Sequence, residues 1–353
     1  MSSTPPPSLV EIARRIETHL DAVLGVEESR WSSFDEDLTS PVEHIRRLVN
    51  SGGKRLRPAF SHWGFVGADG DPDSSMSLDT GAALELLHAF ALFHDDIMDG
   101  SLTRRGVAVT HEVFAEQHRL TGGSGEARRY GEGIAILVGD LAFVYSDRLM
   151  GDAPLAAREI WHELRIELNI GQLLDLIGTS RNERRRYKTE RICRYKSGKY
   201  TIERPLHLGA MLAAPERKEE LLPLLSAYGL PLGDAFQMRD DVMGVFGDTA
   251  LTGKPVGDDL REGKPTPLMA MAVERASHSQ AKVLDKVGLD VLSDDDVRRA
   301  QEAIIDSGAL TEMEELISSL TAQAIDSLEA LPVLPEAKVE LVALAHYVSH
   351  RHM

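Results

Sequence analysis

The stretch "TGAALELLHAFALFHDDIMD", residues 80–99, is almost wholly apolar until it ends in three aspartates. An apolar run of this length is typical of a buried helix rather than of a strand. Helical patterns of apolar residues recur along the rest of the chain, and alternating strand patterns never extend beyond a few residues. The sequence therefore predicts an all-α fold, with one domain and a layered core.

Segments rich in Gly, Pro, Asp and Ser separate the other predicted helices. These helices cover residues 10–26, 41–50, 133–150, 154–177, 188–212, 218–246, 266–276, 293–307, 311–331 and 337–349. The first and last are amphipathic, whereas the central ones are apolar nearly all round. The long breaks at 121–133 and 247–265 are predicted binding loops, and the lysines of the second favour a mobile active-site lid.

Composition narrows the class of protein. The chain has 353 residues, 42% of them hydrophobic and 5% aromatic, which suits a sizeable helical core,. Its single cysteine excludes an internal disulfide and suits a reducing compartment. No secretory signal or membrane-spanning run is recognised, so a cytoplasmic protein with no integral membrane association is expected. The formal net charge of −17 argues against nucleic acid as the main partner,.

The end of helix 80–99 has the chemistry of a metal site. Asp95 and Asp99 are four residues apart, so they share a helix face, near a C-terminus whose dipole disfavours anions. A compensating cation is therefore expected, and Mg²⁺ typically joins one or two carboxylates to substrate phosphates. Arg104 and Arg105 follow, and arginine binds phosphate oxygens as a fork. The stretch predicts a magnesium–diphosphate site, although a solvated acidic helix end has a similar pattern.

A second acidic pair, Asp240 and Asp241 in "FQMRDDVMGVFGD" (236–248), lies on another largely apolar helix. Two such pairs facing one cavity could hold several Mg²⁺ ions around a diphosphate. The following segment carries Lys254 and Lys264, which are either a phosphate clamp or ordinary surface lysines.

Three further stretches are weaker signals when taken alone. "SGGKRLRP" (51–58) resembles an anion site at a helix start,. "RYKSGKYTIERP" (194–205) places Lys196 and Ser197 inside a helix, where a surface lysine is the plain alternative,. His88 lies two turns before Asp95 on almost the same face, and such a histidine is commonly a core residue.

Together, the stretches resemble the trans-type isoprenyl diphosphate synthases, or polyprenyl synthetases. Six motifs occur in that family's order, namely "GGKRLRP", "DDIMDGSLTRRG", "GQLLDL", "YKSGKYT", "FQMRDD" and "GKPVGDDLREGK". The resemblance extends from Gly52 to the last helix. It implies a bundle of about ten core helices around a deep cavity, normally as a homodimer. The N-terminal residues 1–8 are expected to be flexible.

The resemblance also implies a role for each site residue. The expected Mg²⁺ ligands, for three ions that Mn²⁺ can replace, are Asp95, Asp99 and Asp240, with Asp96 and Asp241 in a second tier. The allylic diphosphate is expected to contact Arg104, Lys196, Gln237, Lys254 and the closing lysine Lys264. Isopentenyl diphosphate is expected at Gly53, Lys54, Arg57, His88 and Arg105. The dipoles of Ser197 and Gln237 are expected to face the developing cation.

Two positions depart from the family pattern. Gly244 stands where the second motif usually ends in an aspartate, and Ser197 stands where threonine is common. Activity is expected to survive, because the first aspartate of that motif carries the direct metal contact in the family. Two other classes of protein are alternatives. A class I terpene cyclase would not need "GGKRLRP", and a non-catalytic subunit of a heteromeric synthase would be expected to have lost motif aspartates.

The implied reaction is head-to-tail condensation of isopentenyl diphosphate with dimethylallyl, geranyl or farnesyl diphosphate. In this family, Phe90 and Ala91, five and four places before the first aspartate, help to set product length. An aromatic residue at the fifth place only, without an insertion in "DDIMD", resembles synthases of C20 products. Geranylgeranyl diphosphate is therefore expected, with farnesyl diphosphate or a longer product as the alternative.

Overall fold

The computed structural model describes residues 4–104, 106–247, 256–288 and 291–350. Its regular elements are helices, apart from one two-stranded hairpin within the described residues. The all-α prediction is confirmed. Contacts between Cα atoms divide the chain into two compact units, which are described separately below.

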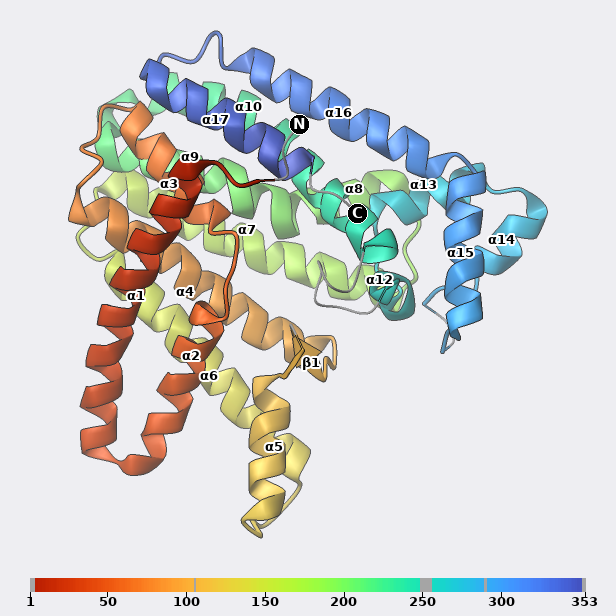
Figure 1. Cartoon of the computed structure of the whole chain (residues 1–353), viewed down its shortest axis with the longest axis horizontal. Coiled ribbons are helices and arrows are strands. Elements are labelled where there is room, and N and C mark those ends of the chain that lie inside the picture. The colour runs from red at the N-terminus through yellow and green to blue at the C-terminus, as the bar shows by residue number, and fades with distance from the viewer. Residues whose placement is uncertain (1–3, 105, 248–255, 289–290, 351–353) are drawn as a thin grey trace. The chain divides into compact units, whose positions relative to one another are not determined.

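The first unit consists of Pro7–His62 and Asp71–Pro154. Its elements are α1 (Pro7–Phe34), the 3₁₀-helix η1 (Glu36–Leu38), α2 (Thr39–Asn50), the start of α3 (Leu56–Gly67), α4 (Ser75–Met98), β1 (Thr103–Arg104), β2 (Val107–Ala108), α5 (Thr110–Leu120) and α6 (Ala127–Leu149). Helix α6 packs along α4 and also against α5, as Figure 1 shows in orange and yellow.

Helix α1 buries one stripe of side chains, as an amphipathic sequence predicts. The buried residues recur every three or four positions: Leu9, Ile12, Ile16, Leu20 and Leu24,. Helix α1 begins at Pro7, so it includes the last two residues of the segment 1–8 that is expected to be flexible. Residues 1–3 lie outside the described part of the chain.

Helix α4 is the centre of the first unit. Every residue from Thr80 to Leu87 is buried, because helices pack around that part of α4 on all sides. By length and composition α4 could cross a membrane, contrary to the expectation that no segment could, but 61% of its apolar window is buried inside the structure. Burial of this kind is typical of a core helix.

The second unit consists of Met1–Pro6, Trp63–Gly70 and Leu155–Met353. Its main elements are α7 (Leu155–Ser180), α8 (Arg186–Cys193), the π-helix η2 (Arg194–Glu203), α9 (Arg204–Ala213), η3 (Pro215–Arg217), α10 (Lys218–Phe246), α12 (Asp258–Glu262), α13 (Pro267–Arg275), α14 (His278–Leu284), α15 (Asp294–Asp306), α16 (Ala309–Ser327) and α17 (Pro335–Ser349). Helices α10 and α16 pack side by side (Figure 1).

A buried apolar cluster joins α10 to the helices that follow it. Its members include Val242 and Val245 of α10, Leu268 of α13, Ile304 of α15 and Ile317 of α16. The first turns of α14 and α15 are fixed by capping boxes, in which Ser277 pairs with Gln280 and Ser293 with Asp296,. This core supports the helix that carries the second acidic pair.

The single helix predicted for 188–212 is wrong in detail. The structure has three consecutive elements there, and the middle one is the π-helix of 10 residues. π-helical segments are rare and frequently mark functional sites. The break predicted at 121–133 is also too long, because α6 already begins at Ala127.

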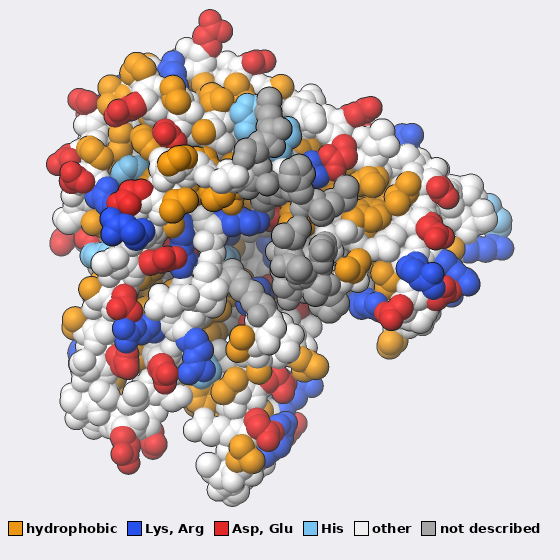
Figure 2. Space-filling view, viewed as in Figure 1, with side chains coloured by type: hydrophobic (Ala, Val, Ile, Leu, Met, Phe, Trp, Pro, Cys, Tyr) orange, Lys and Arg blue, Asp and Glu red, His pale blue; other side chains and the backbone are white. Residues whose placement is uncertain are grey.

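Charged side chains of both signs are interspersed over the face shown in Figure 2. Many charged side chains of the described residues pair along helices or between neighbouring helices, for example Arg46 with Asp21 and Glu28. Exposed pairs of this kind contribute little to stability, typically about 0–1 kcal/mol each. The chain keeps its net charge of −17 despite these pairs, because acidic residues outnumber basic ones.

Candidate active site

The acidic end of α4 is tied to the hairpin that follows it. Arg104 of β1 donates from Nη2 to Oδ1 of Asp96 at 2.7 Å, and from Nε to the same oxygen at 3.0 Å. Its Nη2 atom also lies 3.9 Å from Oδ2 of Asp95. The hairpin thus folds the chain back, so that the predicted phosphate ligand Arg104 lies beside the predicted metal ligands.

Burial and the contact between Asp96 and Arg104 both affect the pKa values of these two groups. Burial raises the pKa of Asp96 above its ordinary value, although the hydrogen bonds from Arg104 oppose that shift,. Burial lowers the pKa of Arg104, but the bond to Asp96 and the charges of Asp95 and Asp99 raise it more, so the guanidinium stays charged. Asp96 is therefore engaged by the protein, which fits its second-tier place behind Asp95 and Asp99.

Asp99 ends α4 as its C-cap residue. Its backbone N–H donates to the carbonyl of Asp95 at 2.8 Å, so the two residues lie one helical turn apart, as their spacing predicts. Both carboxyl groups are half-buried. The carboxylates of Asp95 and Asp99 thus belong to one helix end, in the neighbourhood of an arginine.

The predicted isopentenyl diphosphate residues lie on three elements of the same unit. Gly53 and Lys54 are exposed in the segment between α2 and α3, Arg57 is in the first turn of α3, and His88 is in the middle of α4. Arg105 lies outside the described residues.

Sequence reasoning missed Arg55, which anchors this segment. Its side chain is 3% exposed and forms a buried ion pair with Glu85 of α4. It also donates to the Val49 carbonyl and, at 3.1 Å, to Oε1 of Glu17. Arg55 has a left-handed φ of 48°, and its side chain is buried although that of its neighbour Lys54 is exposed,. An arginine among arginines and lysines gives no sequence signal for this role.

In the second unit, the π-helix carries Lys196 and Ser197. Nζ of Lys196 lies 2.5 Å from Oδ2 of Asp175, a buried residue of the "GQLLDL" stretch on α7. Ser197 is half-buried on the same turn. The π-helix therefore places the predicted diphosphate lysine beside an acidic partner that sequence reasoning had not assigned.

The π-helix packs against one face of α7, where the contacting residues of α7 are small or acidic. A Cβ atom on Gly171 would lie 2.4 Å from the backbone nitrogen of Lys196, so only glycine permits this approach. Four residues earlier on α7, Glu167 binds Lys199 and Arg204, the latter from Nε at 2.6 Å. On the other side, Gly233 of α10 touches the backbone of Gly198. These contacts fix the register of the π-helix.

The second acidic pair lies near the end of α10. Gln237 donates to Oδ1 of Asp241 at 2.8 Å, so its amide is already oriented by the helix. Asp241 is 4% exposed, and burial raises its pKa well above the ordinary value. Its Oδ2 atom has no hydrogen-bond partner within the part of the chain that the structure describes. Asp240 is half-buried, which fits its expected place ahead of Asp241 as a metal ligand.

In the segment that follows α10, the short helix α12 packs back against α10. Lys264 lies 2.6 Å from Oε2 of Glu262 and 3.5 Å from Oδ1 of Asp259. Lys254 and the other residues of 248–255 in the predicted lid lie outside the described residues.

The donor set suits a cation that shares its ligands with a substrate. Over residues 4–104, 106–247, 256–288 and 291–350, no three His, Cys, Asp or Glu side chains are gathered as a complete metal site. Mg²⁺ needs only one or two carboxylates when phosphate oxygens complete its coordination. The buried, unpartnered oxygen of Asp241 agrees with such a site, because buried acceptors are normally satisfied,.

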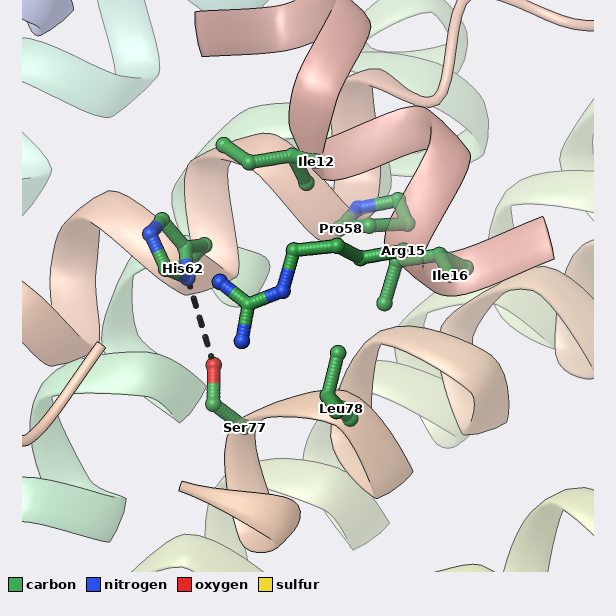
Figure 3. Close-up of a pocket in the computed structure, with 7 residues that line it drawn as sticks. All are labelled: Ile12, Arg15, Ile16, Pro58, His62, Ser77 and Leu78. Carbon is green, nitrogen blue, oxygen red and sulfur yellow. Dashed lines mark hydrogen bonds between the residues drawn. The ribbon is translucent and has the colours of Figure 1, made fainter. Parts of the chain in front are cut away.

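Two cavities lie away from these residues. The one in Figure 3 is formed by α1, α3 and α4, is lined by Arg15, His62 and Ser77 among others, and has a volume of about 10 Å³. That is room for roughly one water molecule. A larger pocket of about 330 Å³ adjoins the ion pair of Arg194 and Asp234 beside α16. Neither contains a predicted site residue.

Comparison with known proteins identifies the family of the chain. The sequence pattern of the polyprenyl synthetase family matches residues 39–304. A geranylfarnesyl diphosphate synthase of Aeropyrum pernix is 32% identical over 86% of this chain and 92% of its own length. A (2E,6E)-farnesyl diphosphate synthase of Mycobacterium tuberculosis is 29% identical over 98% of this chain and 90% of its own.

A solved structure has the same fold over almost the whole chain. It is a geranylgeranyl pyrophosphate synthase from Corynebacterium glutamicum, complexed with isoprenyl diphosphate and magnesium. The TM-score is 0.90 at 36% identity, and the match covers 97% of this chain and 99% of that one. The fold is thus the all-α isoprenoid synthase fold, and the enzyme class is prenyltransferase. The chain belongs to the polyprenyl synthetase family.

Proposed function

We propose that this prenyltransferase condenses isopentenyl diphosphate with an allylic diphosphate to give a trans-prenyl diphosphate five carbons longer, and that geranylgeranyl diphosphate is its main product. The observation that carries the proposal is the end of α4, where the Asp96–Arg104 pair sets a guanidinium beside Asp95 and Asp99. Carboxylates for a metal and an arginine for phosphate are thereby gathered on one helix end.

Asp95, Asp99 and Asp240 are the residues that would hold Mg²⁺, with Asp96 and Asp241 behind them. When bound, Mg²⁺ (three ions in this proposal, replaceable by Mn²⁺) supplies positive charge to the leaving diphosphate. The chain's own cations act on the same charge. Arg104, Lys196, Lys254 and Lys264 bind the allylic diphosphate and favour ionisation of its C–O bond.

The remaining residues orient the two substrates. Gly53, Lys54, Arg57, His88 and Arg105 bind isopentenyl diphosphate so that its double bond faces the allylic carbon. Ser197 and Gln237 turn their dipoles toward the allylic cation, and the hydrogen bond from Gln237 to Asp241 supports that orientation. The released diphosphate accepts the proton that is lost on elimination.

The proposal also concerns the length of the prenyl product. The ring of Phe90 contacts the ring of Phe143, with centroids 4.8 Å apart, so this aromatic side chain is held against α6. Ala91 adds little bulk one turn before Asp95, which leaves room for a chain longer than C15. The relatives include farnesyl, geranylgeranyl and geranylfarnesyl diphosphate synthases, so C15 and longer products are the alternatives.

The experiment is incubation with labelled isopentenyl diphosphate and dimethylallyl, geranyl or farnesyl diphosphate in turn, with chromatography of the dephosphorylated products. A C20 alcohol from at least one primer is expected. Product from an allylic diphosphate alone would indicate a terpene cyclase, and a chain inactive with all three primers would indicate a non-catalytic subunit. Either outcome would overturn the proposal.

We also propose a cytoplasmic homodimer in which residues 1–353 act as one functional domain. Helix α7 carries a stripe of exposed aliphatic side chains that suits a second copy: Ile166, Ile170, Leu173 and Ile177,. Sedimentation velocity is expected to show a dimer, and Ile170→Lys should shift it toward the monomer. A monomer at micromolar concentration for the unsubstituted protein would refute the dimer.

A further inference from the structure

Glu167 of α7 lies outside all six sequence motifs, yet two cations of other elements bind its carboxylate. Arg204 donates to it from Nε to Oε2 at 2.6 Å and from Nη2 to Oε1 at 2.8 Å, and Lys199 donates to Oε1. The Glu167 side chain is 8% exposed, so these contacts form a buried ion cluster. Burial raises the pKa of Glu167, but the hydrogen bonds from Arg204 and Lys199 lower it more, so the carboxyl group stays ionised,.

The two cations can share one carboxylate because they lie on a π-helix. The backbone N–H of Arg204 donates to the carbonyl of Lys199, five residues earlier, which is the hydrogen bond of a π-helical turn,. The two residues are therefore about one turn apart and share a face. In an α-helix, residues five apart differ in direction by about 140°, so their side chains would not both face Glu167. Glu167 thus binds a pair that only the π-helical register brings together.

The register also determines the direction of Lys196 and Ser197. A π-helical turn holds more residues than an α-helical turn, so a change to α-helix would rotate the preceding residues by on the order of 100° about the helix axis. On α7, Glu167, Gly171 and Asp175 follow at intervals of four and share one face. Asp175 accepts from Nζ of Lys196 at 2.5 Å, and such a rotation would carry Lys196 away from it.

We propose that Glu167 is a positioning residue, which stabilises the π-helical register by binding Lys199 and Arg204 together and so directs Lys196 and Ser197 toward the allylic diphosphate. Glu167 acts through the π-helix and has no contact of its own with substrate. The inference rests on the proposed function, because it takes Lys196 and Ser197 as residues that act on the allylic substrate.

The alternative is that Glu167 only neutralises buried positive charge. Glu203 is a second anion of the cluster, with Oε2 3.7 Å from Nζ of Lys199. The four charged side chains, Glu167, Glu203, Lys199 and Arg204, therefore balance one another. Removal of Glu167 and Lys199 together keeps this balance but breaks the link between positions 199 and 204, so the two roles predict different results for that double variant.

The first test shortens the carboxylate side chain and keeps its charge. Glu167→Asp is expected to lower kcat by about 10- to 100-fold with geranyl diphosphate as primer, since small misplacements of catalytic groups have effects of that size. The KM for isopentenyl diphosphate should not change, because its proposed ligands lie on other helices. The matched control is Glu159→Asp, also on α7, whose exposed carboxylate lies 2.6 Å from Nζ of Lys218. An unchanged kcat in Glu167→Asp would refute the inference.

The double variant Glu167→Met with Lys199→Met separates the two roles. Its kcat should remain at least about tenfold below that of the unsubstituted enzyme, because the link is broken although the charges balance. Lys199→Arg can still bind Glu167 and should keep kcat within about threefold. Recovery of the original kcat in the double variant would show that Glu167 serves charge balance alone, and would overturn the inference.

Hydrogen exchange tests the same role without turnover. In the unliganded protein, the backbone amides of residues 194–203 are expected to exchange about tenfold faster in Glu167→Asp and in the double variant than in the unsubstituted protein or in Glu159→Asp. Equal exchange rates in all four proteins would contradict the assignment. If the unsubstituted protein forms no prenyl product, the proposed function fails, whereas the exchange rates still decide whether Glu167 stabilises the π-helix.

Discussion

The ammonium group of Lys196 lies 2.5 Å from the carboxylate of Asp175, so a lysine of the proposed diphosphate site has a buried acidic partner on α7. This ion pair orients the lysine before substrate arrives, and orientation of that kind lowers the barrier of the chemical step. Asp175 itself repels a diphosphate, so it would not be expected to add to substrate affinity.

Replacement of Asp175 by asparagine should therefore separate the two steady-state constants. We expect kcat to fall by about 10- to 100-fold, since small misplacements of catalytic groups have effects of that size. The KM for the allylic diphosphate should not rise. Initial-rate measurements give both constants, with Asp306→Asn on the exposed face of α15 as control. A raised KM at unchanged kcat would show that Asp175 serves binding instead.

The two acidic groups should both be needed for turnover. Asp95→Ala and Asp240→Ala each remove a carboxylate of the proposed metal site, so kcat is expected to fall by several orders of magnitude while circular dichroism stays helical. Excess EDTA should abolish turnover by the unsubstituted enzyme, and added Mg²⁺ or Mn²⁺ should restore it. Near-normal rates in either variant, or in EDTA, would contradict this assignment.

The packing of the π-helix against α7 should require glycine at position 171. Gly171→Ala places a methyl group 2.4 Å from the backbone nitrogen of Lys196, and overpacking of this kind typically costs about 1–3 kcal/mol,. The free energy of unfolding in urea should fall by that amount, and kcat should fall with it. Gly25→Ala in α1 is the control, because its Cβ meets nothing within 4 Å. Equal stability of the two variants would exclude the steric argument.

Acid should destabilise the second unit through His207. Burial lowers its pKa in the folded protein from 6.5 to about 3, so the unfolded chain binds a proton that the folded chain does not,. Stability from this residue is complete above pH 6.5 and declines as the pH falls toward 3. At pH 5 the loss is about 2 kcal/mol, at 1.36 kcal/mol per pKa unit.

Urea unfolding of the unsubstituted protein and of His207→Gln at pH 7 and pH 5 measures this term. The histidine protein should lose about 2 kcal/mol more than the glutamine variant over that interval. His207 Nε2 lies 3.1 Å from the Ser226 hydroxyl, and glutamine offers a neutral side chain for similar hydrogen bonding without the titration. The same pH dependence in both proteins would rule out His207 as the source.

The sequence predicted the parts of this structure that local patterns determine. The apolar helix with its terminal aspartates was recognisable because a buried helix and a dense acidic end are both local features. Helix α3 was missed because Pro58 and two glycines are typical of turns, although proline is tolerated in a first helical turn,. Helix α5 was missed because it buries few apolar side chains, chiefly Phe114 and Ala115.

Tertiary contacts determine the rest of the candidate site. The π-helix needs Gly171 and Gly233 on two neighbouring helices, and its own sequence continues a helical pattern without interruption. Likewise, the motif alone shows that position 244 carries glycine and no acidic residue. The close approach of Asp259 to that position depends on the packing of α12 against α10, which no local pattern encodes.

Product length is expected to respond to one residue of α4. The ring of Phe90 is held between Phe143 of α6, at 4.8 Å between centroids, and His94, at 4.7 Å. Ala91 is the next residue, about 100° further round the helix, and lies one turn before Asp95. A growing prenyl chain that passes below Asp95 would therefore meet the small side chain of Ala91 before it meets Phe90.

Ala91→Phe should shorten the main product by one or more isoprene units, because an aromatic ring would occupy the space one turn below Asp95. The measurement is chromatography of the dephosphorylated products with farnesyl and geranyl diphosphate as primers. Ala322→Phe on the exposed face of α16 adds the same ring elsewhere and should leave the product profile unchanged. If Ala91→Phe also leaves it unchanged, then Ala91 does not limit chain growth, and variants of Phe90 and Phe143 would be the next to measure.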